Sequence, residues 1–353
     1  TAEQAASTAP ALTDFFGAQA LSAGSSGFLV DAYQRRASGE DPGPPVDGLI
    51  NYESVLLGMA DPLELIYPSD GVITADYPLT VLASAPPEAR DAHRRLAEYL
   101  RTPAVQQAIM ERTGRRPAVP GIELQPRFGT ASLVELPFPA QADVVDTLLT
   151  SWFDKVRRPS RTIYVLDTSG SMAEGTRIDD LKSALAGLSG ADTSLIGRYR
   201  QFRGREEVTL LPFSSTPAAP QRFTVAEDDP QPDRDAVAAA AQALFPEGGT
   251  AIYDSLGRAY EIAGEQIAAD PDRFTSIVLM TDGENTDGGD LERFRGYVAG
   301  FPEALRGVPV FTVLFGESAT GEMEEVARLT GGRTFDARSV PLTQVFSEIR
   351  GYV

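Results

Sequence analysis

Short apolar runs alternate with amphipathic segments along the C-terminal part of the chain. Four runs are apolar throughout, as expected for strands buried on both faces: 162–166, 208–213, 276–280 and 310–315. The segments between them carry apolar residues at helical spacing and predict helices: 178–188, 236–244, 253–267 and 321–329. Buried strands that alternate with helices predict a doubly wound, mostly parallel α/β sheet over residues 161–353.

Residues before about position 135 are richer in Pro and Gly and show no such alternation. Here the pattern predicts a strand over 63–71, a turn, and a second strand over 75–79. It also predicts a helix over 87–99, and a following helix that Thr102 caps and Gly114 ends.

A helix-forming segment, 144–156, lies in a connector that we place at residues 136–160. Its large apolar residues are Leu148, Leu149, Trp152 and Phe153. We expect these side chains to hold the two parts of the chain together, with Trp152 as a core residue.

Composition excludes several functional classes. The 353 residues include 31 Lys and Arg against 50 Asp and Glu, which gives a net charge of −19 and disfavours a nucleic-acid partner. Cysteine is absent and His93 is the one histidine. Thiolate nucleophiles and Cys/His zinc sites therefore lack their residues, and a Ser-His-Asp triad near Ser169 or Ser171 would need the fold to carry His93 there. The position of His93 in a helical segment indicates an exposed helical residue.

Three turns rich in oxygen atoms stand beside the predicted strands. Asp167-Thr168-Ser169-Gly170-Ser171 follows the first strand, Thr281-Asp282-Gly283 follows the strand at 276–280, and Gly248-Gly249-Thr250 precedes a helix. Ligands of doubly wound sheets bind beyond the carboxyl ends of the strands, where the strand order reverses. If the two Asp-bearing strands are neighbours, the three turns meet there and form a site for a hard cation.

Residues 161–353, which contain these three turns, resemble a von Willebrand factor type A domain. The metal-ion-dependent adhesion site of that family has the pattern Asp-x-Ser-x-Ser, then a Thr after glycines, then an Asp in a Thr-Asp-Gly turn. Matching positions occur in the same order: Asp167, Ser169, Ser171, Thr250 and Asp282. The resemblance implies a Rossmann-like fold in which these side chains hold Mg²⁺, some of them through water.

The chemistry of the five side chains agrees with this ion. Mg²⁺ takes about six oxygens, and three hydroxyls with two carboxylates leave a position open. The family resemblance implies that this position accepts an acidic side chain of a partner protein. Mn²⁺ is expected to substitute, whereas Ca²⁺ prefers more oxygens. Four nearby acids are expected to be solvated or to contact the metal ligands without binding the metal themselves: Glu174, Glu247, Asp254 and Glu284.

An enzymatic alternative starts from the same Asp167. Phosphatases of the haloacid dehalogenase type also carry an Asp at a strand end and use Mg²⁺, but they need a second Asp two residues later as the acid and base. That position is Ser169 here, so the carboxylic acid that would transfer the proton is missing. We therefore expect no catalytic residues and a binding function.

The first part of the chain resembles the later portion of a type 2 periplasmic solute-binding protein. The motifs are Tyr67-Pro68, Asp70-Gly71, the paired helices and a Gly-x-x-Pro stop at Gly114. We expect an α/β lobe over residues 1–135 that binds no small solute tightly by itself. Four polar residues are candidates to face a ligand, although turn and cap roles are expected for them: Ser25, Ser26, Asn51 and Glu53.

Together the two modules predict a metal-dependent adhesion or recognition protein outside a bacterial membrane, anchored or secreted through a segment that this chain does not include. The alternative is an extracellular solute sensor or transport-associated protein that uses the A domain to dock a partner. In that case the full-length protein is expected to bind a small solute.

Overall fold

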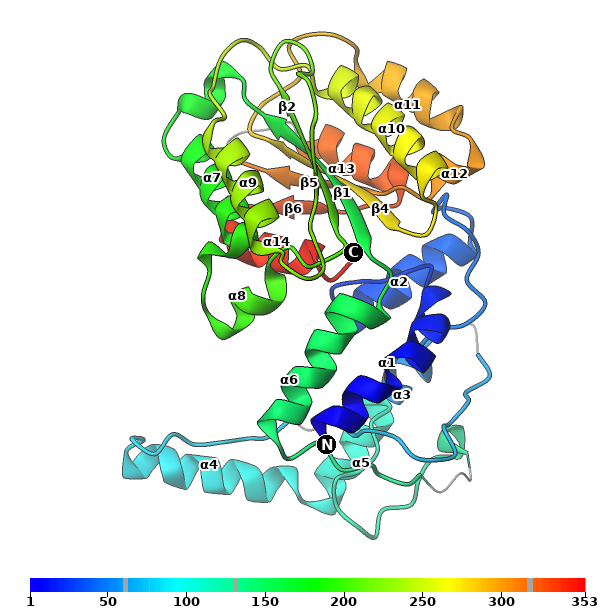
Figure 1. Cartoon of the computed structure of the whole chain (residues 1–353). Helices are drawn as coiled ribbons and strands as arrows, with labels where there is room; N and C mark the ends of the chain where they lie inside the picture. Colours follow the sequence, from blue (N-terminus) through cyan, green and yellow to red (C-terminus); the bar gives the residue numbers. More distant parts are fainter. Residues whose placement is uncertain (60–62, 76, 130–132, 316–319, 353) are drawn as a thin grey trace. The chain divides into compact units, whose positions relative to one another are not determined.

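The computed structural model describes residues 1–59, 63–75, 77–129, 133–315 and 320–352 (Figure 1). The chain forms two compact units. One comprises Thr1–Asp47 together with Ala142–Val353, and the other comprises Gly48–Gln141. The first 47 residues therefore group with the C-terminal part, although the sequence motifs assign them to the solute-binding-like region; the boundaries at 135 and 160 remain predictions.

A six-stranded sheet forms the centre of the larger unit, in the order β3-β2-β1-β4-β5-β6. Its strands are β1 (Ser160–Asp167), β2 (Glu207–Phe213), β3 (Gln221–Thr224), β4 (Phe274–Thr281), β5 (Val310–Leu314) and β6 (Thr334–Asp336). All neighbours pair in parallel except β2 and β3, which are antiparallel. The predicted mostly parallel α/β sheet is confirmed, whereas the two edge strands β3 and β6 were not predicted.

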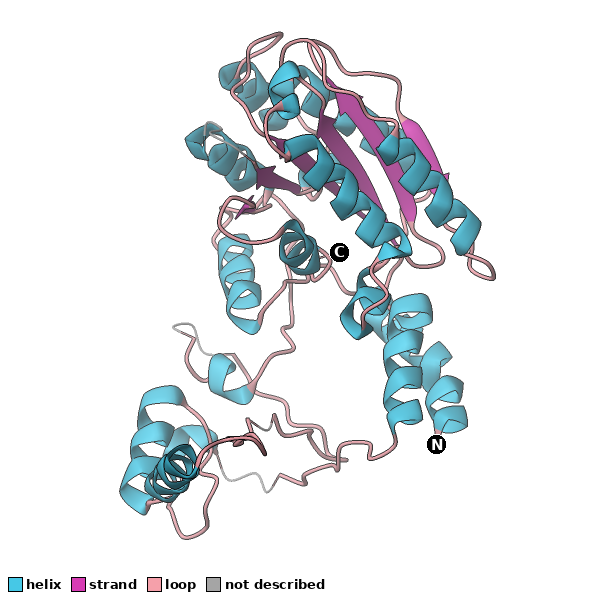
Figure 2. Ribbon diagram, turned by 90° about the vertical axis from the view of Figure 1, so that its left-hand side faces the viewer, coloured by secondary structure: helices cyan, strands magenta, loops and turns pink. Residues whose placement is uncertain are grey.

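Helices cover both faces of this sheet (Figures 1 and 2). Their bounds are η3 (Gly170–Ala173), α7 (Arg177–Ala186), η4 (Gly187–Ala191), α8 (Leu195–Arg200), α9 (Gln231–Gln242), α10 (Ile252–Ala269), α11 (Leu291–Ala299), α12 (Glu303–Arg306), α13 (Thr320–Thr330) and α14 (Leu342–Ile349). The four predicted helices correspond to α7 with η4, α9, α10 and α13.

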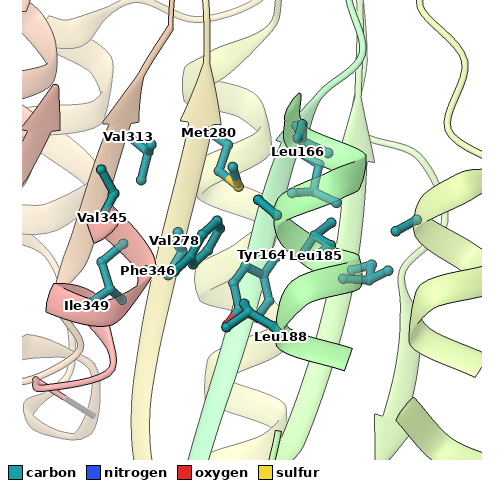
Figure 3. Packing of buried hydrophobic residues seen from close by; sticks show 14 of the residues in the cluster. Tyr164, Leu166, Leu185, Leu188, Val278, Met280, Val313, Val345, Phe346 and Ile349 are labelled. Atoms are coloured by element: carbon teal, nitrogen blue, oxygen red, sulfur yellow. The ribbon is translucent and has the colours of Figure 1, made fainter. Parts of the chain in front are cut away.

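Two apolar layers fix the helices to the sheet. On one face Tyr164 and Val278 pack with residues of α7, α9 and α14, including Phe346 (Figure 3). On the other face Ile163 and Ile277 pack with α10 to α13. Residues 163–166 of β1 alternate between the two layers, and all eight residues of the strand are buried because helices cover both faces of the sheet.

The N-terminal helices α1 (Ala2–Gly17) and α2 (Ser26–Ala37) were not predicted. The predicted connector helix appears as α6 (Ala142–Ser151) with the π-helical turn η2 (Trp152–Val156). The rings of Trp152 and Phe16 meet edge to face with centroids 4.7 Å apart, so Trp152 ties the connector to α1. Leu148 and Leu149 are 40% and 39% exposed, and their part in holding the two halves together stays a prediction. Ser25 caps α2 by accepting a hydrogen bond from Phe28 N, the expected structural role.

The smaller unit contains α3 (Glu53–Leu56), α4 (Pro87–Leu100), α5 (Pro103–Thr113) and the 3-10 turn η1 (Pro126–Phe128). The two predicted helices are confirmed, and Gly114 ends α5 in the left-handed conformation at φ 67°. Glu53 accepts hydrogen bonds from Tyr67 Oη at 2.6 Å and Arg116 Nε at 2.8 Å, which is a structural role.

The strand pair predicted over 63–71 and 75–79 is wrong for the described residues, and Asp76 lies outside them. Val72 makes an isolated bridge with Glu135 instead. A strand needs a hydrogen-bonded neighbouring strand and a surface that covers its apolar side chains. Here the side chains of Ile66 and Ile73 are left 87% and 64% exposed. The apolar pattern is present, but the described residues of this unit form no sheet on which it packs.

Candidate metal centre

The candidate site lies where the strand order reverses. β1 has β2 on one side and β4 on the other, both parallel to it, so the chain leaves β1 at the point where the two halves of the sheet diverge. Asp167 is the last residue of β1, and Asp282 directly follows β4. The adjacency of these two strands, on which the predicted site depends, is confirmed.

Asp167 is fixed at both carboxylate oxygens. Oδ1 accepts a hydrogen bond from Ser169 N at 2.8 Å, and Oδ2 accepts one from Thr281 Oγ1 at 2.6 Å. Burial raises the pKa of Asp167 above its ordinary value; hydrogen bonds from Ser169 and Thr281 oppose the rise, and the negative charge of Asp282 adds to it. A cation beside these two carboxylates would relieve their repulsion.

Hydroxyl groups connect the two carboxylates. Ser169 Oγ lies 3.0 Å from Ser171 Oγ, which donates to Asp282 Oδ1 at 2.8 Å. A methyl group placed on Gly283 would lie 3.7 Å from Ser171 Oγ and 4.0 Å from Thr250 Oγ1. The structure thus brings the five predicted side chains to one place, with Ser171 Oγ and Thr250 Oγ1 both within van der Waals distance of a methyl group at Gly283.

Backbone contacts hold the three turns together. Gly170 N donates to Gly248 O at 3.0 Å, and Glu247 N donates to Thr168 O at 2.7 Å. Three side-chain oxygens that were not assigned to the site accept further hydrogen bonds from the backbone: Ser215 Oγ from Gly249 N, Thr286 Oγ1 from Thr250 N, and Asn285 Oδ1 from Ile252 N. These contacts set where the Thr250 hydroxyl lies.

Arg177, at the start of α7, is a further member of the cluster that was not predicted. Its Nη1 lies 2.7 Å from Asp282 Oδ2 and 3.1 Å from Ser171 O. The Asp282 side chain is fully buried and that of Arg177 is 25% exposed. The chain thus places one of its own cations against the carboxylate, which shows that this position favours positive charge.

Two of the four nearby acids form ion pairs with arginines. Glu174 is 71% exposed and forms an ion pair with Arg177 at 3.3 Å, and Asp254 pairs with Arg293 at 3.4 Å. Within the described part of the chain, no three His, Cys, Asp or Glu side chains gather as a metal site would need. Because two carboxylates are present, a metal here would depend on the hydroxyl ligands. Oxygen donors of this kind fit Mg²⁺ or Mn²⁺.

Among the described residues, none of the helices combines the length and apolar composition that crossing a membrane requires.

Two family models match this chain. Residues 162–284 match the von Willebrand factor type A domain, and residues 11–116 match the bacterial extracellular solute-binding protein family. Both resemblances expected from the motifs are therefore confirmed, over shorter stretches than expected.

Two curated relatives are calcium-activated chloride channel regulator 1 from Homo sapiens and from Sus scrofa. They are 32% identical over 169 residues and 31% identical over 172 residues. Each alignment covers 48% of this chain and 16% of the relative, so the chain spans less than a fifth of the length of these proteins.

Similar solved structures include a von Willebrand factor type A protein from Catenulispora acidiphila, with 18% identity, a TM-score of 0.43, and coverage of 56% of this chain and 43% of that one. Another is the pilus adhesin SpaC from Lactobacillus rhamnosus GG, with 13% identity, a TM-score of 0.40, and coverage of 55% and 30%. Proximal thread matrix protein 1 from the mussel byssus shows 18% identity, a TM-score of 0.38, and coverage of 53% and 46%.

Proposed function

Because this chain carries a von Willebrand factor type A domain and a stretch of solute-binding-protein sequence, we propose that it is a metal-dependent protein-binding module of a bacterial cell envelope. Asp167, Ser169, Ser171, Thr250 and Asp282 would hold Mg²⁺ or Mn²⁺. The partner would be a protein that offers an acidic side chain. The chain would bind and would not catalyse.

The observation that carries this proposal is the chain of oxygen contacts from Ser169 through Ser171 to Asp282, with steps of 3.0 and 2.8 Å. The donor set is one that hard divalent cations prefer. When bound, the ion would supply a Lewis-acidic position for a carboxylate of the partner. The residues of this chain would orient the ion through the bonds that fix Asp167.

The solute-binding match over residues 11–116 supports an extracytoplasmic location and a second candidate function. In this second reading the protein senses or carries a solute, and the A domain docks a partner. Binding of a small solute by the full-length protein with sub-millimolar affinity would favour sensing over adhesion.

The first experiment measures melting temperature against Mg²⁺, Mn²⁺ and Ca²⁺. A ligand at about 100 times its Kd adds about 2.7 kcal/mol of stability, which raises the melting temperature of a domain of this size by roughly 5–10 °C. Ser171→Ala and Asp282→Asn should abolish the rise. Asp272→Asn, an exposed acid in the turn before β4, is the control and should keep it. No response of the unmodified protein to any of the three ions would refute the proposal.

A second experiment tests the partner. The protein is used to capture proteins from a cell-envelope fraction in Mg²⁺ and again in EDTA. A partner retained in Mg²⁺, lost in EDTA and lost with Ser171→Ala would support metal-dependent recognition. Equal capture under all three conditions would contradict it.

A further inference from the structure

A cavity of about 380 Å³ lies in the larger unit, at the opposite end of the sheet from the candidate metal centre. Arg158, just before β1, and Phe274, the first residue of β4, contribute to its wall. Aromatic rings form much of the remaining wall, among them Trp152 and Tyr352. The volume is within the range of small-molecule sites, and the apolar wall suits the body of an organic ligand.

The charge of this cavity is opposite to that of the chain. Four arginines line it, and no Asp or Glu does so among the described residues: Arg157, Arg158, Arg200 and Arg350. The chain as a whole has a net charge of −19. A cationic cavity in so acidic a protein concentrates positive charge at one place, which favours an anionic ligand.

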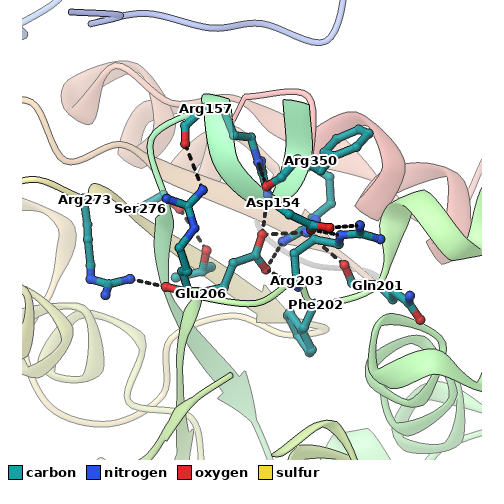
Figure 4. Close-up of polar contacts among 12 residues, drawn as sticks. Asp154, Arg157, Gln201, Phe202, Arg203, Glu206, Arg273, Ser276 and Arg350 are labelled. Carbon is teal, nitrogen blue, oxygen red and sulfur yellow. Dashed lines mark hydrogen bonds and ion pairs between the residues drawn. The ribbon is translucent and has the colours of Figure 1, made fainter. Parts of the chain in front are cut away.

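Two of the four arginines are already neutralised in part. Arg157 and Arg350 share the buried carboxylate of Glu206, which Arg350 Nη1 and Nη2 each approach at 2.8 Å (Figure 4). Arg203, beside them, pairs with Asp154 at 2.7 Å. One carboxylate between two guanidinium groups leaves an excess of positive charge. Burial lowers the pKa of Arg157 to about 10; Glu206 opposes this, and the charges of Arg350, Arg203 and Arg205 lower it further.

The other two arginines, Arg158 and Arg200, form no ion pair within the described residues. Arg158 donates to the carbonyl oxygens of Pro271, Asp272 and Arg273 at 3.3 to 3.5 Å. Arg200 donates to Thr343 O at 3.4 Å, and its buried Nε has no hydrogen-bond partner in the described structure. A buried donor without a partner costs free energy.

We propose that this cavity binds a small amphiphilic carboxylate. The carboxylate group lies between Arg158 and Arg200, and the apolar body packs against Trp152, Phe274 and Tyr352. Hydrogen bonds from guanidinium to carboxylate are charge-assisted and strong, and the aromatic wall gives the body its contact area. This site is separate from the metal centre and does not depend on the proposed adhesion function.

The test uses octanoate as the probe and Trp152 as the reporter. Trp152 is the one tryptophan of the chain and lines the cavity, so a change in tryptophan fluorescence reports binding there. Isothermal titration calorimetry provides an independent affinity. We expect saturable binding of octanoate, about tenfold weaker in Arg158→Gln and in Arg200→Gln. The control Arg222→Gln removes an exposed arginine on β3 that pairs with Glu265 and should bind as the unmodified protein does.

Two further probes test, on the unmodified protein, whether the cavity needs both the charge and the apolar chain of the ligand. Octanamide has the same apolar chain without the charge and should bind at least tenfold more weakly than octanoate. Inorganic phosphate has the charge without the chain and should also bind weakly. Equal binding of octanamide would reduce the site to an apolar groove and overturn the proposal, as would phosphate binding as tightly as octanoate. Absence of saturable octanoate binding would do the same. Asp282→Asn should leave octanoate affinity unchanged, which separates this proposal from the metal centre.

Discussion

Replacing Arg177 by Gln tests whether the guanidinium occupies the position that a metal ion would take. Arg177 Nη1 lies 2.7 Å from the fully buried carboxylate of Asp282. Gln is shorter, carries no charge, and can still donate a hydrogen bond toward Ser171 O. The substitution therefore removes the cation while keeping a polar group at the edge of the site. Under the proposed function, a metal ion that binds Asp282 must compete with Arg177.

The expected magnitude follows from the contacts. A hydrogen bond to a charged group contributes about 1.5–3 kcal/mol net. If the metal must displace that bond, its removal strengthens metal binding by about 10- to 100-fold. Without metal, the variant leaves Asp282 buried without its cation. We expect a loss of about 2 kcal/mol, below the 3–5 kcal/mol typical of fully buried pairs, because the Arg177 side chain is 25% exposed.

The assay is calorimetric titration with Mg²⁺ together with melting curves at zero and saturating metal. Arg177→Gln should melt below the unmodified protein without metal and recover most of the difference with it. Arg293→Gln is the matched control: this arginine pairs with Asp254 on the surface and is 74% exposed, so both measurements should stay unchanged.

The reasoning is refuted if Arg177→Gln binds Mg²⁺ with equal or lower affinity than the unmodified protein. In that case the guanidinium would be a structural partner of Asp282 that coexists with the ion. The double variant Arg177→Gln/Asp282→Asn checks the cause of the gain. It should lose the increased affinity, because the carboxylate that the gain depends on is absent.

Three further predictions concern stability. Glu206→Gln should lower the free energy of unfolding at neutral pH by about 3–5 kcal/mol, measured by urea titration, since it leaves Arg157 and Arg350 buried without their acid; unchanged stability would contradict this role. Burial raises the pKa of Glu206, but Arg350 and Arg157 outweigh it and hold the pKa below its ordinary value of 4.5. The stability that ionised Glu206 contributes is therefore complete above pH 4.5 and is lost as pH falls through the folded pKa. Glu206→Gln should flatten the acid limb of a curve of unfolding free energy against pH. Gly332→Ala should lower the free energy of unfolding by about 1–3 kcal/mol, because the added methyl group would lie 2.0 Å from Val310 O. The control Gly321→Ala, in α13 with no atom within 4 Å of its new methyl group, should leave that free energy unchanged or raise it slightly.

The sheet was predictable where its strands are buried on both faces. The runs at β1, β2, β4 and β5 are apolar because helices cover both sides, and such runs are visible without a structure. β3 is a short edge strand of Gln221, Arg222, Phe223 and Thr224, mostly exposed, so it carries no apolar signal. The opposite error occurred at 63–71, where apolar residues predict a strand and no pairing partner forms. Sequence patterns report burial tendency and do not report whether a neighbour exists.

The two carboxylates of the candidate site were predictable because they stand at the ends of strands. Asp167 and Asp282 directly follow apolar runs, and their meeting depends on one assumption about strand order, which the structure confirms. Arg177 could not be assigned, because arginines at helix starts are common and its contact joins residues 105 positions apart. Thr286 and Asn285 follow Asp282 in a polar run, which was a signal that could have identified them as supports of the Thr250 turn.

The proposed metal site and the proposed anion cavity lie at opposite ends of β1. β1 has eight residues and spans about 26 Å at about 3.3 Å per residue, roughly three times the Debye length of about 8 Å at physiological ionic strength. Asp167 ends this strand, while Arg157 and Arg158 precede it. A carboxylate cluster and an arginine cluster placed closer together would pair with each other and leave neither free for a ligand. The length of the central strand would therefore keep the proposed cation site and the proposed anion site apart in the same unit.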